Sequence, residues 1–210
     1  MEKKIRIACL GDSVTSGVGI EISVRARDNY PGQLQAMLGD GYEVLNFGRS
    51  GAYVVDENSK WKNPRPAAAS YSKTEKYKEA LVSNPDIVVL CLGSNDSRTV
   101  NKDEPESTDE LYEGLIRYGR SMEELPSKPK IYIALSPYRY DVPVCMKNLD
   151  EAILPTQEKV ARDMGWGFID LHTPTKNAHL SGREIYTDKA HMTKEGYEIM
   201  ALEVKKALGL

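Results

Sequence analysis

Residues 5–17 have the sequence IRIACLGDSVTSG, an apolar run followed at once by a turn flanked by Gly11 and Gly17. The apolar run predicts a β-strand, and the turn after it would bring Ser13 to the rim of a sheet. In α/β proteins the chemistry lies outside the carboxyl ends of the strands, where such a turn belongs. Far downstream, the sequence DKAH places Asp188 three residues before His191. A serine at one end and an Asp/His pair at the other suggest a hydrolase with a serine nucleophile.

Further short apolar runs predict four more strands, with enough chain between them for helices. They cover residues 42–47, 87–92, 131–135 and 167–169. The run at 87–92 is apolar without alternation, as expected for a strand covered on both faces of a parallel sheet. The alternation of strands and helices predicts one domain over residues 1–210. Its expected architecture is α/β, a three-layer α/β/α sandwich with a mainly parallel sheet of about five strands.

Helix signals lie between the predicted strands. Pro31 is suited to a first helical turn that Gly39 would end, and Ser107 begins a stretch with the spacing of a capping box. Residues 148–164 predict a helix that Pro155 interrupts near its start, and Thr193 is a candidate cap for a last amphipathic helix.

Residues 48–69 and 136–147 are predicted to be long loops. Both follow strand ends on the same side as Ser13, so we expect them to form walls of a site.

The bulk properties exclude several classes of protein. With 210 residues, 40% hydrophobic and 28% charged, the chain has the composition of an ordinary globular domain. A net charge of −3 gives no basic footprint for nucleic acid. No apolar stretch approaches the roughly 18 residues of a membrane span. The first residues carry no export signal, which predicts a cytoplasmic protein as written, or a periplasmic or secreted one if a signal has been removed. Composition leaves the oligomeric state open.

The cysteines and histidines predict neither disulfides nor a metal centre. Cys9 and Cys91 lie inside apolar runs and are expected to be buried thiols, and Cys145 has no local partner that would activate it. The three histidines lack the helical His pair of common zinc motifs, so we expect no metal and no cofactor. The stretch DLH at 170–172 offers a rival Asp/His pair, with His172 as a weaker candidate base.

Four separated segments, GDSVTSG at 11–17, NFGRSG at 46–51, LGSND at 92–96 and DKAH at 188–191, carry the strongest functional signal. Together and in this order they resemble the four blocks of the SGNH (GDSL) hydrolase superfamily. The resemblance spans nearly the whole chain and implies a flavodoxin-like sandwich that hydrolyses esters. It implies Ser13 as nucleophile, His191 as base and Asp188 as the partner of the base. It also implies Gly48 and Asn95 as oxyanion donors.

Elementary chemistry agrees with these roles. A serine hydroxyl needs a base to take its proton during attack, and an imidazole titrates near neutral pH. Asp188 would hold the ring of His191 in the required tautomer. The N–H groups of Ser13 and Gly48 and the amide of Asn95 would stabilise the oxyanion. A glycine suits this position because its backbone can approach the substrate closely.

The substrate is expected to be a carbohydrate ester. The chain holds 12 Tyr and 2 Trp against 2 Phe, and amphipathic rings suit sugars. Residues 92–98, 125–135 and 169–173 also look similar to bacterial carbohydrate O-acetylesterases of this superfamily, including some labelled sialate O-acetylesterases. We therefore expect the removal of small acyl groups, above all acetyl, through an acyl-enzyme.

Side chains in or beside the two loops are candidates for contact with this substrate. Arg98 and Arg139 could pair with the carboxylate of an acidic sugar. Asp12 is expected to bond turn amides beside the substrate, without a catalytic role. The full set of candidates is Asp12, Trp61, Arg98, Tyr138, Arg139 and Tyr140.

Two alternatives stay open at this point. One is a thioesterase or lysophospholipase-type acyl hydrolase, which would prefer longer acyl chains. The other is a non-catalytic carbohydrate-binding domain that keeps only the outline of the site.

Overall fold

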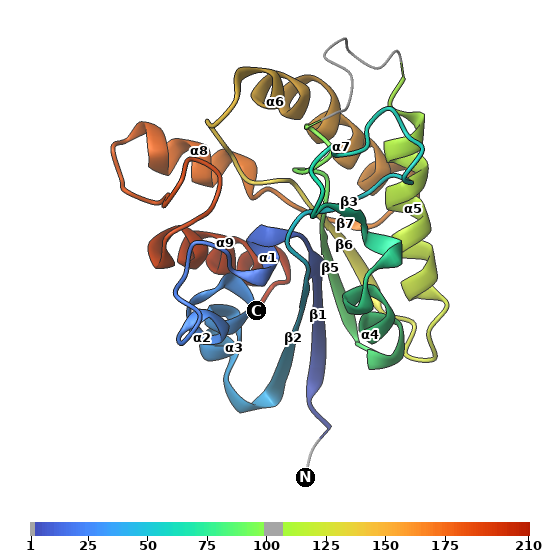
Figure 1. The fold of residues 1–210 in the computed structure, drawn as a ribbon. Coiled ribbons are helices and arrows are strands. Elements are labelled where there is room, and N and C mark those ends of the chain that lie inside the picture. The colour runs from blue at the N-terminus through green and yellow to red at the C-terminus, as the bar shows by residue number, and fades with distance from the viewer. Residues whose placement is uncertain (1–2, 99–106) are drawn as a thin grey trace.

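The strands form one parallel sheet in a computed structural model, which describes residues 3–98 and 107–210 (Figure 1). The sheet consists of β1 (Ile5–Gly11), β2 (Tyr42–Gly48), β5 (Ile87–Cys91), β6 (Lys130–Ala134) and β7 (Gly167–Ile169). Their order is β2-β1-β5-β6-β7, and every neighbouring pair is parallel. This is the flavodoxin-like order, with the first two strands exchanged. All five predicted strands are confirmed, and so is the predicted fold class.

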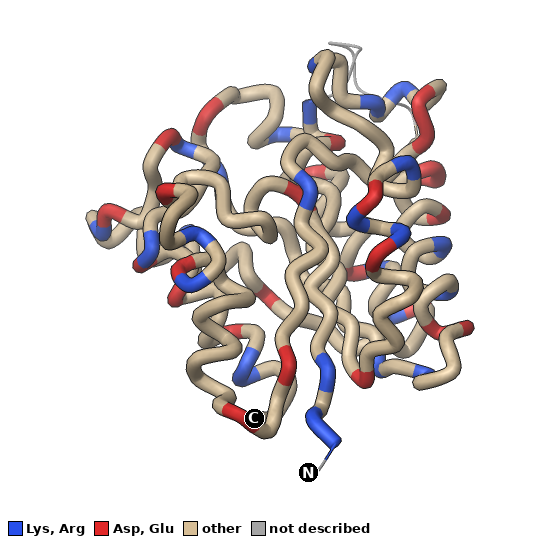
Figure 2. The backbone as a smooth tube through the Cα atoms, turned by 60° about the horizontal axis from the view of Figure 1, so that its bottom comes forward, with Lys and Arg blue, Asp and Glu red and all other residues tan. Residues whose placement is uncertain are grey.

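Helices cover both faces of the sheet, as Figure 1 shows. One face packs against α3 (Tyr30–Leu38), α8 (His172–Leu180) and α9 (Lys194–Ala207), and the short helices α1 (Ser13–Ser16) and α2 (Arg25–Asp28) lie on the same side. The other face packs against α4 (Glu75–Ser83), α5 (Asp109–Glu123) and α7 (Leu154–Met164). Lys and Arg alternate with Asp and Glu along the helices and loops (Figure 2). No helix within residues 3–98 and 107–210 combines the length and apolar character that crossing a bilayer requires.

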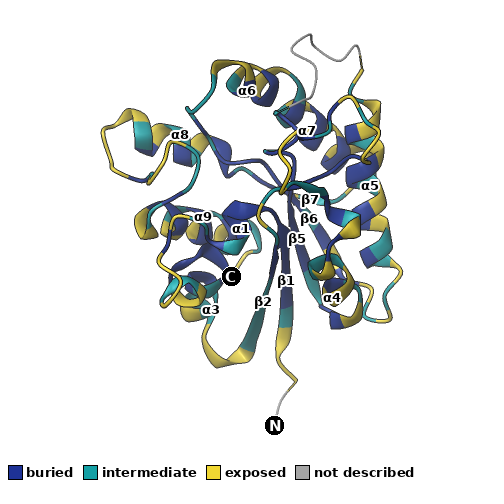
Figure 3. Ribbon diagram, viewed as in Figure 1, coloured by how far each residue is buried: buried dark blue, intermediate teal, exposed yellow. Residues whose placement is uncertain are grey.

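The strands β1, β2, β5 and β6 contribute to two cores because successive side chains point to opposite faces. In β1, Ile7 and Cys9 belong to the cluster under α3 and α9, whereas Ala8 and Leu10 belong to the cluster under α5 and α7. All four side chains are fully buried, and Figure 3 shows the same burial along the inner sides of the helices. Burial on both faces explains why these strands are apolar without alternation.

The helix signals hold at three predicted boundaries. Pro31 lies in the first turn of α3, which ends before Gly39. α5 begins where predicted but without the predicted capping box: its N-cap is Thr108, which makes no side-chain cap hydrogen bond, and the Ser107 hydroxyl accepts the Asp109 N–H, 3.1 Å away. Thr193 caps α9 by accepting from the Gly196 N–H.

The loop predicted over residues 136–147 is wrong at its end, because α6 (Pro143–Asn148) begins there. This helix continues through a π-helical turn, Leu149–Ile153, into α7. Pro143 lies in the first turn of α6, where a missing N–H costs nothing. The wider turn before α7 accommodates the ring of Pro155, so the predicted interruption is a change of helical pitch. The other predicted loop carries the short strand β3 (Ala52–Tyr53), which pairs with β4 (Ala69–Ser70).

Candidate active site

The candidate site lies where the strand order of the sheet reverses. β1 has β2 on one side and β5 on the other, and the crevice at such a switch point is where open α/β sheets bind ligands. Ser13 follows β1 and Asn95 follows β5, so both reach this crevice. The pocket found there is lined by Ser13, Val14, Ser50, Gly51, Arg65, Ala67, Ala68, Ser94, Asn95, Arg98, Arg139, Ala190 and His191.

Ser13 is placed by the turn that the opening sequence predicted. The carboxylate of Asp12 accepts the Val14 N–H at 2.9 Å and so caps α1, whose first residue is Ser13. Gly17 ends this short helix with a φ of 87°, a left-handed conformation that glycine adopts without strain. Because the first N–H groups of a helix lack partners within it, the Ser13 N–H points out of α1, and it makes no hydrogen bond to the described residues.

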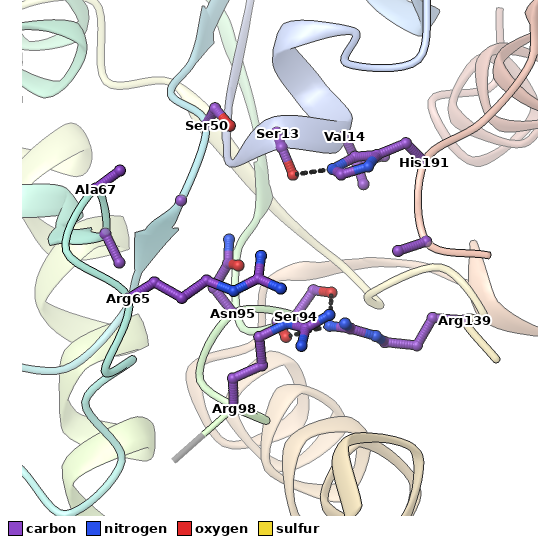
Figure 4. Close-up of a pocket in the computed structure, with 13 residues that line it drawn as sticks. Ser13, Val14, Ser50, Arg65, Ala67, Ser94, Asn95, Arg98, Arg139 and His191 are labelled. Atoms are coloured by element: carbon purple, nitrogen blue, oxygen red, sulfur yellow. Dashed lines mark hydrogen bonds between the residues drawn. The ribbon is translucent and has the colours of Figure 1, made fainter. Parts of the chain in front are cut away.

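The structure brings Ser13, His191 and Asp188 together. His191 Nε2 lies 3.0 Å from Ser13 Oγ, and His191 Nδ1 lies 2.7 Å from Asp188 Oδ2 (Figure 4 shows the first contact). With the ring proton on Nδ1, the ring donates to Asp188 and accepts the hydroxyl proton of Ser13. This continuous row of hydrogen bonds is the geometry that a general base acting on a serine requires.

The loop of Asp188 holds the imidazole in this direction. Asp188 Oδ1 accepts the N–H groups of Ala190 and His191, at 3.2 and 2.7 Å. Burial raises the pKa of the Asp188 carboxyl, but the hydrogen bonds from the side chain and backbone of His191 outweigh it, so the net pKa is lowered. Lys189 adopts a left-handed φ of 71°, and its carbonyl accepts the Tyr140 N–H at 3.0 Å. The lowered pKa keeps Asp188 ionised beside the ring.

Asn95, the predicted oxyanion donor, lines the pocket. Its Nδ2 donates to the Ala52 carbonyl at 3.0 Å and lies 3.4 Å from Asp12 Oδ2. The second contact is long, so one amide hydrogen is only weakly held. Asn63 donates to the Asn95 carbonyl at 3.1 Å and fixes this residue from behind.

Gly48 does not occupy the predicted position of an oxyanion donor. Its N–H donates to Asn46 Oδ1 at 2.8 Å, and Gly48 is not among the residues that line the pocket. A glycine is still needed at this position, but because of α1 and not because of a substrate. A Cβ here would lie 2.2 Å from the Ser16 nitrogen in α1. Gly51, which the sequence analysis passed over, lines the pocket with a φ of 77°. The N–H of Gly51 makes no hydrogen bond to the described part of the chain.

Two buried carboxyl groups lie beneath the site. Burial raises the pKa of Asp12 to about 6, against the opposing effects of the Val14 N–H and of the nearby His191 and Arg139 side chains. Burial also raises the pKa of Asp96 to about 8. The carboxylate oxygens of Asp96 lie 2.9 and 3.0 Å from the Val54 nitrogen and so tie the segment after β3 to the end of β5. The only sequence signal for this structural role of Asp96 was its place in the segment LGSND.

The structure places the predicted aromatic contacts elsewhere. Trp61 is 2% exposed, belongs to the core, and donates its indole N–H to the Ser107 carbonyl at 2.9 Å. It therefore does not contact the pocket, because the long loop turns the ring inward. Tyr138 and Tyr140 do not line the pocket either. They stack beside His179, with ring centroids of Tyr140 and His179 4.1 Å apart, next to the loop that carries Asp188.

The predicted arginines do line the pocket, and a third one joins them. The guanidinium groups of Arg98 and Arg139 share the carboxylate of Asp141. Arg139 also donates to the Ser94 carbonyl at 2.9 Å. Arg65, which the sequence analysis did not single out, extends from residues 48–69 into the pocket (Figure 4).

The rival pair does not reach this site. His172 is 7% exposed, faces the Ser136 carbonyl at 3.3 Å, and lies 3.7 Å from Asp150. Burial lowers its pKa. Within the described ranges, no group of three or more His, Cys, Asp or Glu side chains is placed to hold a metal ion.

A flavodoxin-like sheet with a serine, a histidine and an aspartate hydrogen-bonded in a row at its switch point is an arrangement of the serine hydrolase class. Within that class, the chain belongs to the GDSL-like lipase/acylhydrolase family, whose model matches residues 9–199.

Known proteins resemble the chain at two levels. It is 31% identical to an acetylxylan esterase of Xylanibacter ruminicola over 99% of its own length, and it spans 44% of the length of that relative. A carbohydrate acetylesterase family member from Sinorhizobium meliloti superposes with a TM-score of 0.70 at 19% identity, covering 98% of this chain and 100% of the other. An acetyl xylan esterase from Geobacillus stearothermophilus gives a TM-score of 0.71 at 17% identity, covering 98% and 94%. At these identities the two structures establish the fold alone.

Proposed function

We propose that the chain is a serine esterase that removes small acyl groups, above all acetyl, from a hydroxyl of a carbohydrate. The observation that carries this proposal is the row from Asp188 through His191 to Ser13, which ends in an open pocket. The same row argues against a non-catalytic carbohydrate-binding domain, because binding a sugar does not require a base on a serine.

The reaction follows from the positions of these atoms. Ser13 Oγ attacks the ester carbonyl while His191 Nε2 takes its proton. The proton then passes from the imidazolium to the leaving sugar oxygen, and an acyl-serine remains. A water molecule attacks the acyl-serine by the same route, giving up a proton to His191. The carboxylic acid leaves, and Ser13 regains its hydroxyl.

In this proposal, three donors stabilise the oxyanion of each tetrahedral intermediate. They are the N–H groups of Ser13 and Gly51 and the side-chain amide of Asn95. All three residues line the pocket, and neither N–H has a partner among the described residues. Donors already in position cost no reorganisation during the reaction.

The pocket walls favour a short acyl group. Eight of the thirteen lining residues are polar or charged, and the other five are glycine, alanine or valine. A long acyl chain would need a continuous apolar channel, which this lining does not provide. The similarity to an acetylxylan esterase supports the acetyl group and the carbohydrate.

A chain-length series tests this proposal. We expect hydrolysis of 4-nitrophenyl acetate to exceed that of the butyrate and octanoate esters. Ser13→Ala should abolish turnover, whereas the control Ser23→Ala changes an exposed serine whose hydroxyl donates to Glu21 and should leave turnover intact. Acetate release from acetylated xylo-oligosaccharides then tests the carbohydrate. Full activity in Ser13→Ala would refute the mechanism, and an octanoyl preference would favour the thioesterase or lysophospholipase alternative.

A further inference from the structure

The charged side chains that line the pocket are all arginines: Arg65, Arg98 and Arg139. Elsewhere on the molecule both signs of charge alternate (Figure 2). A concave site whose lining carries one sign of charge concentrates ligands of the opposite sign. The pocket therefore differs in charge from the rest of the described surface.

The charges of Arg98 and Arg139 are partly neutralised within the protein. Arg98 and Arg139 share one carboxylate, that of Asp141, so two positive charges face a single negative one. Burial lowers the pKa of Arg98, and the positive charges of Arg139 and Arg65 add to that effect. The positive charge around the pocket thus exceeds what Asp141 balances.

The other nearby carboxylates are already bound. Asp188 accepts the His191 ring and two backbone N–H groups. Asp12 accepts the Val14 N–H from beneath the pocket. Neither one contacts Arg65, whose guanidinium makes no hydrogen bond or ion pair with any residue that the structure describes.

The backbone of Arg65 is nevertheless held firmly to the site. Its N–H donates to Asn63 Oδ1 at 3.1 Å, and its carbonyl accepts the Ala68 N–H at 2.9 Å. Asn63 is 1% exposed and donates to the Asn95 carbonyl. The loop that presents Arg65 is therefore tied to a proposed oxyanion donor, and the guanidinium extends from it into the pocket (Figure 4).

We propose that Arg65 binds a carboxylate of the sugar substrate, so that the enzyme prefers acylated acidic sugars, of the uronic acid kind, to neutral ones. This inference rests on the proposed esterase function and names its substrate class. A guanidinium offers two parallel N–H donors that match the two oxygens of a carboxylate. Arg65 is in this view a specificity-determining residue, and Arg98 adds positive charge behind it.

Paired substrates separate this role from that of an ordinary solvated arginine. We would compare mono-acetylated methyl glucuronides, with the acetyl group on O2, O3 or O4, with their C6 carboxamides, which have the same shape without the charge. For at least one position, wild-type kcat/KM should be about tenfold higher for the carboxylate, as expected for a charge-assisted hydrogen bond of about 1.4 kcal/mol. High salt should reduce this ratio, because the guanidinium is exposed.

Variants of Arg65 locate the source of the preference. In Arg65→Gln the ratio of carboxylate to carboxamide should fall to about one, mainly through KM, and in Arg65→Lys it should be intermediate, because a lysine keeps the charge but loses the paired donors. The control Arg162→Gln makes the same change of net charge on α7, close to the start of β7 and so at the opposite edge of the sheet from Ser13. It should keep the wild-type ratio.

The outcomes distinguish this inference from the proposed function. If Ser13-dependent hydrolysis of acetyl esters is present but every pair gives a ratio near one, or Arg65→Gln leaves the ratio unchanged, the inference is wrong and the esterase stands. Ser13→Ala protein gives a readout without turnover: calorimetry should show the glucuronide binding about tenfold more tightly than its carboxamide, a difference that Arg65→Gln removes. Equal affinities would also overturn the inference.

Discussion

Replacing Asp188 by asparagine should harm catalysis more than replacing it by alanine. Asp188 Oδ1 accepts two backbone N–H groups, from Ala190 and His191, which only an oxygen can do. An asparagine would keep its oxygen there, so its NH2 group would replace Oδ2 at 2.7 Å from His191 Nδ1. That NH2 group favours the tautomer with a bare Nδ1 and a proton on Nε2. A protonated Nε2 cannot accept the proton of Ser13.

The two expected losses follow from the geometry. The side chain of Asp188 is 55% exposed, so water screens its charge. In Asp188→Ala, water can replace the acceptor, and the lost interaction with the imidazolium is about 1–2 kcal/mol, a fall of about tenfold in kcat. In Asp188→Asn, restoring the working tautomer places two N–H donors face to face. This adds an unsatisfied donor worth about 1–3 kcal/mol, which gives a total fall of about 10²–10³.

Steady-state kinetics on 4-nitrophenyl acetate measures both variants, and circular dichroism checks that they are folded. Nuclear magnetic resonance of the His191 ring nitrogens should show the proton on Nδ1 in the wild type and on Nε2 in Asp188→Asn. If the asparagine variant is the more active of the two, or if both match the wild type, Asp188 does not set the tautomer and the proposed role is wrong.

Three further predictions concern the glycines, the buried carboxyl groups and the core. Gly51→Ala should lower kcat by about tenfold or more, because it shifts an oxyanion donor. Gly48→Ala should instead lower the urea midpoint of unfolding, because its Cβ would lie 2.2 Å from the Ser16 nitrogen. The reverse pattern would make Gly48 the oxyanion donor. The raised pKa values of Asp12 and Asp96, about 6 and 8, mean that the folded state binds these protons more tightly than the unfolded state, so their contribution to stability is lost as pH rises from about 4 to 8. Urea unfolding at pH 5 and 8 measures this loss, and an unchanged pH dependence in Asp96→Asn would contradict it. Trp61→Ala should cost about 3–5 kcal/mol of unfolding free energy without altering the preference among sugar esters, and an altered preference would place Trp61 at the substrate after all.

The sequence predicted the fold because the inner strands β1, β5 and β6 are buried on both faces over most of their length and are apolar there. Where apolar runs alternate with amphipathic helices along a chain, a run such as 87–92 has few alternatives to a buried parallel strand. The meeting of Ser13 with His191 could be anticipated for a related reason. Residues that directly follow parallel strands must gather at one edge of the sheet, and resemblance to a known family supplied the pairing with the distant DKAH segment.

The sequence could not show what each glycine or aromatic ring of the long loop contacts. Gly48 and Gly51 lie three residues apart in one segment. A Cβ at Gly48 would lie 2.2 Å from the Ser16 nitrogen, whereas Gly51 has a left-handed φ of 77°. Only the packing shows that α1 fills the space beside Gly48 while Gly51 faces the pocket. Likewise, Trp61 has the amphipathic ring of a sugar contact, but the ring is buried in the core cluster and donates to the distant Ser107 carbonyl. The start of α6 at Pro143 was missed because a proline suits a turn as well as the first turn of a helix.

Two parts of the fold therefore build the site in different ways. The reacting groups follow strands directly or, like His191, are fixed by a short hydrogen-bonded loop, so the sheet and a few backbone contacts determine their geometry. Arg65 comes from residues 48–69, a long loop that Asn63 and Asp96 tie to the segment after β5. Changes at Arg65 can consequently alter which ester is bound without moving Ser13, whereas changes at Asp188 alter the rate for every ester. Kinetics should separate the two kinds of variant, with the first changing the ratio between paired substrates and the second lowering kcat for both members of a pair.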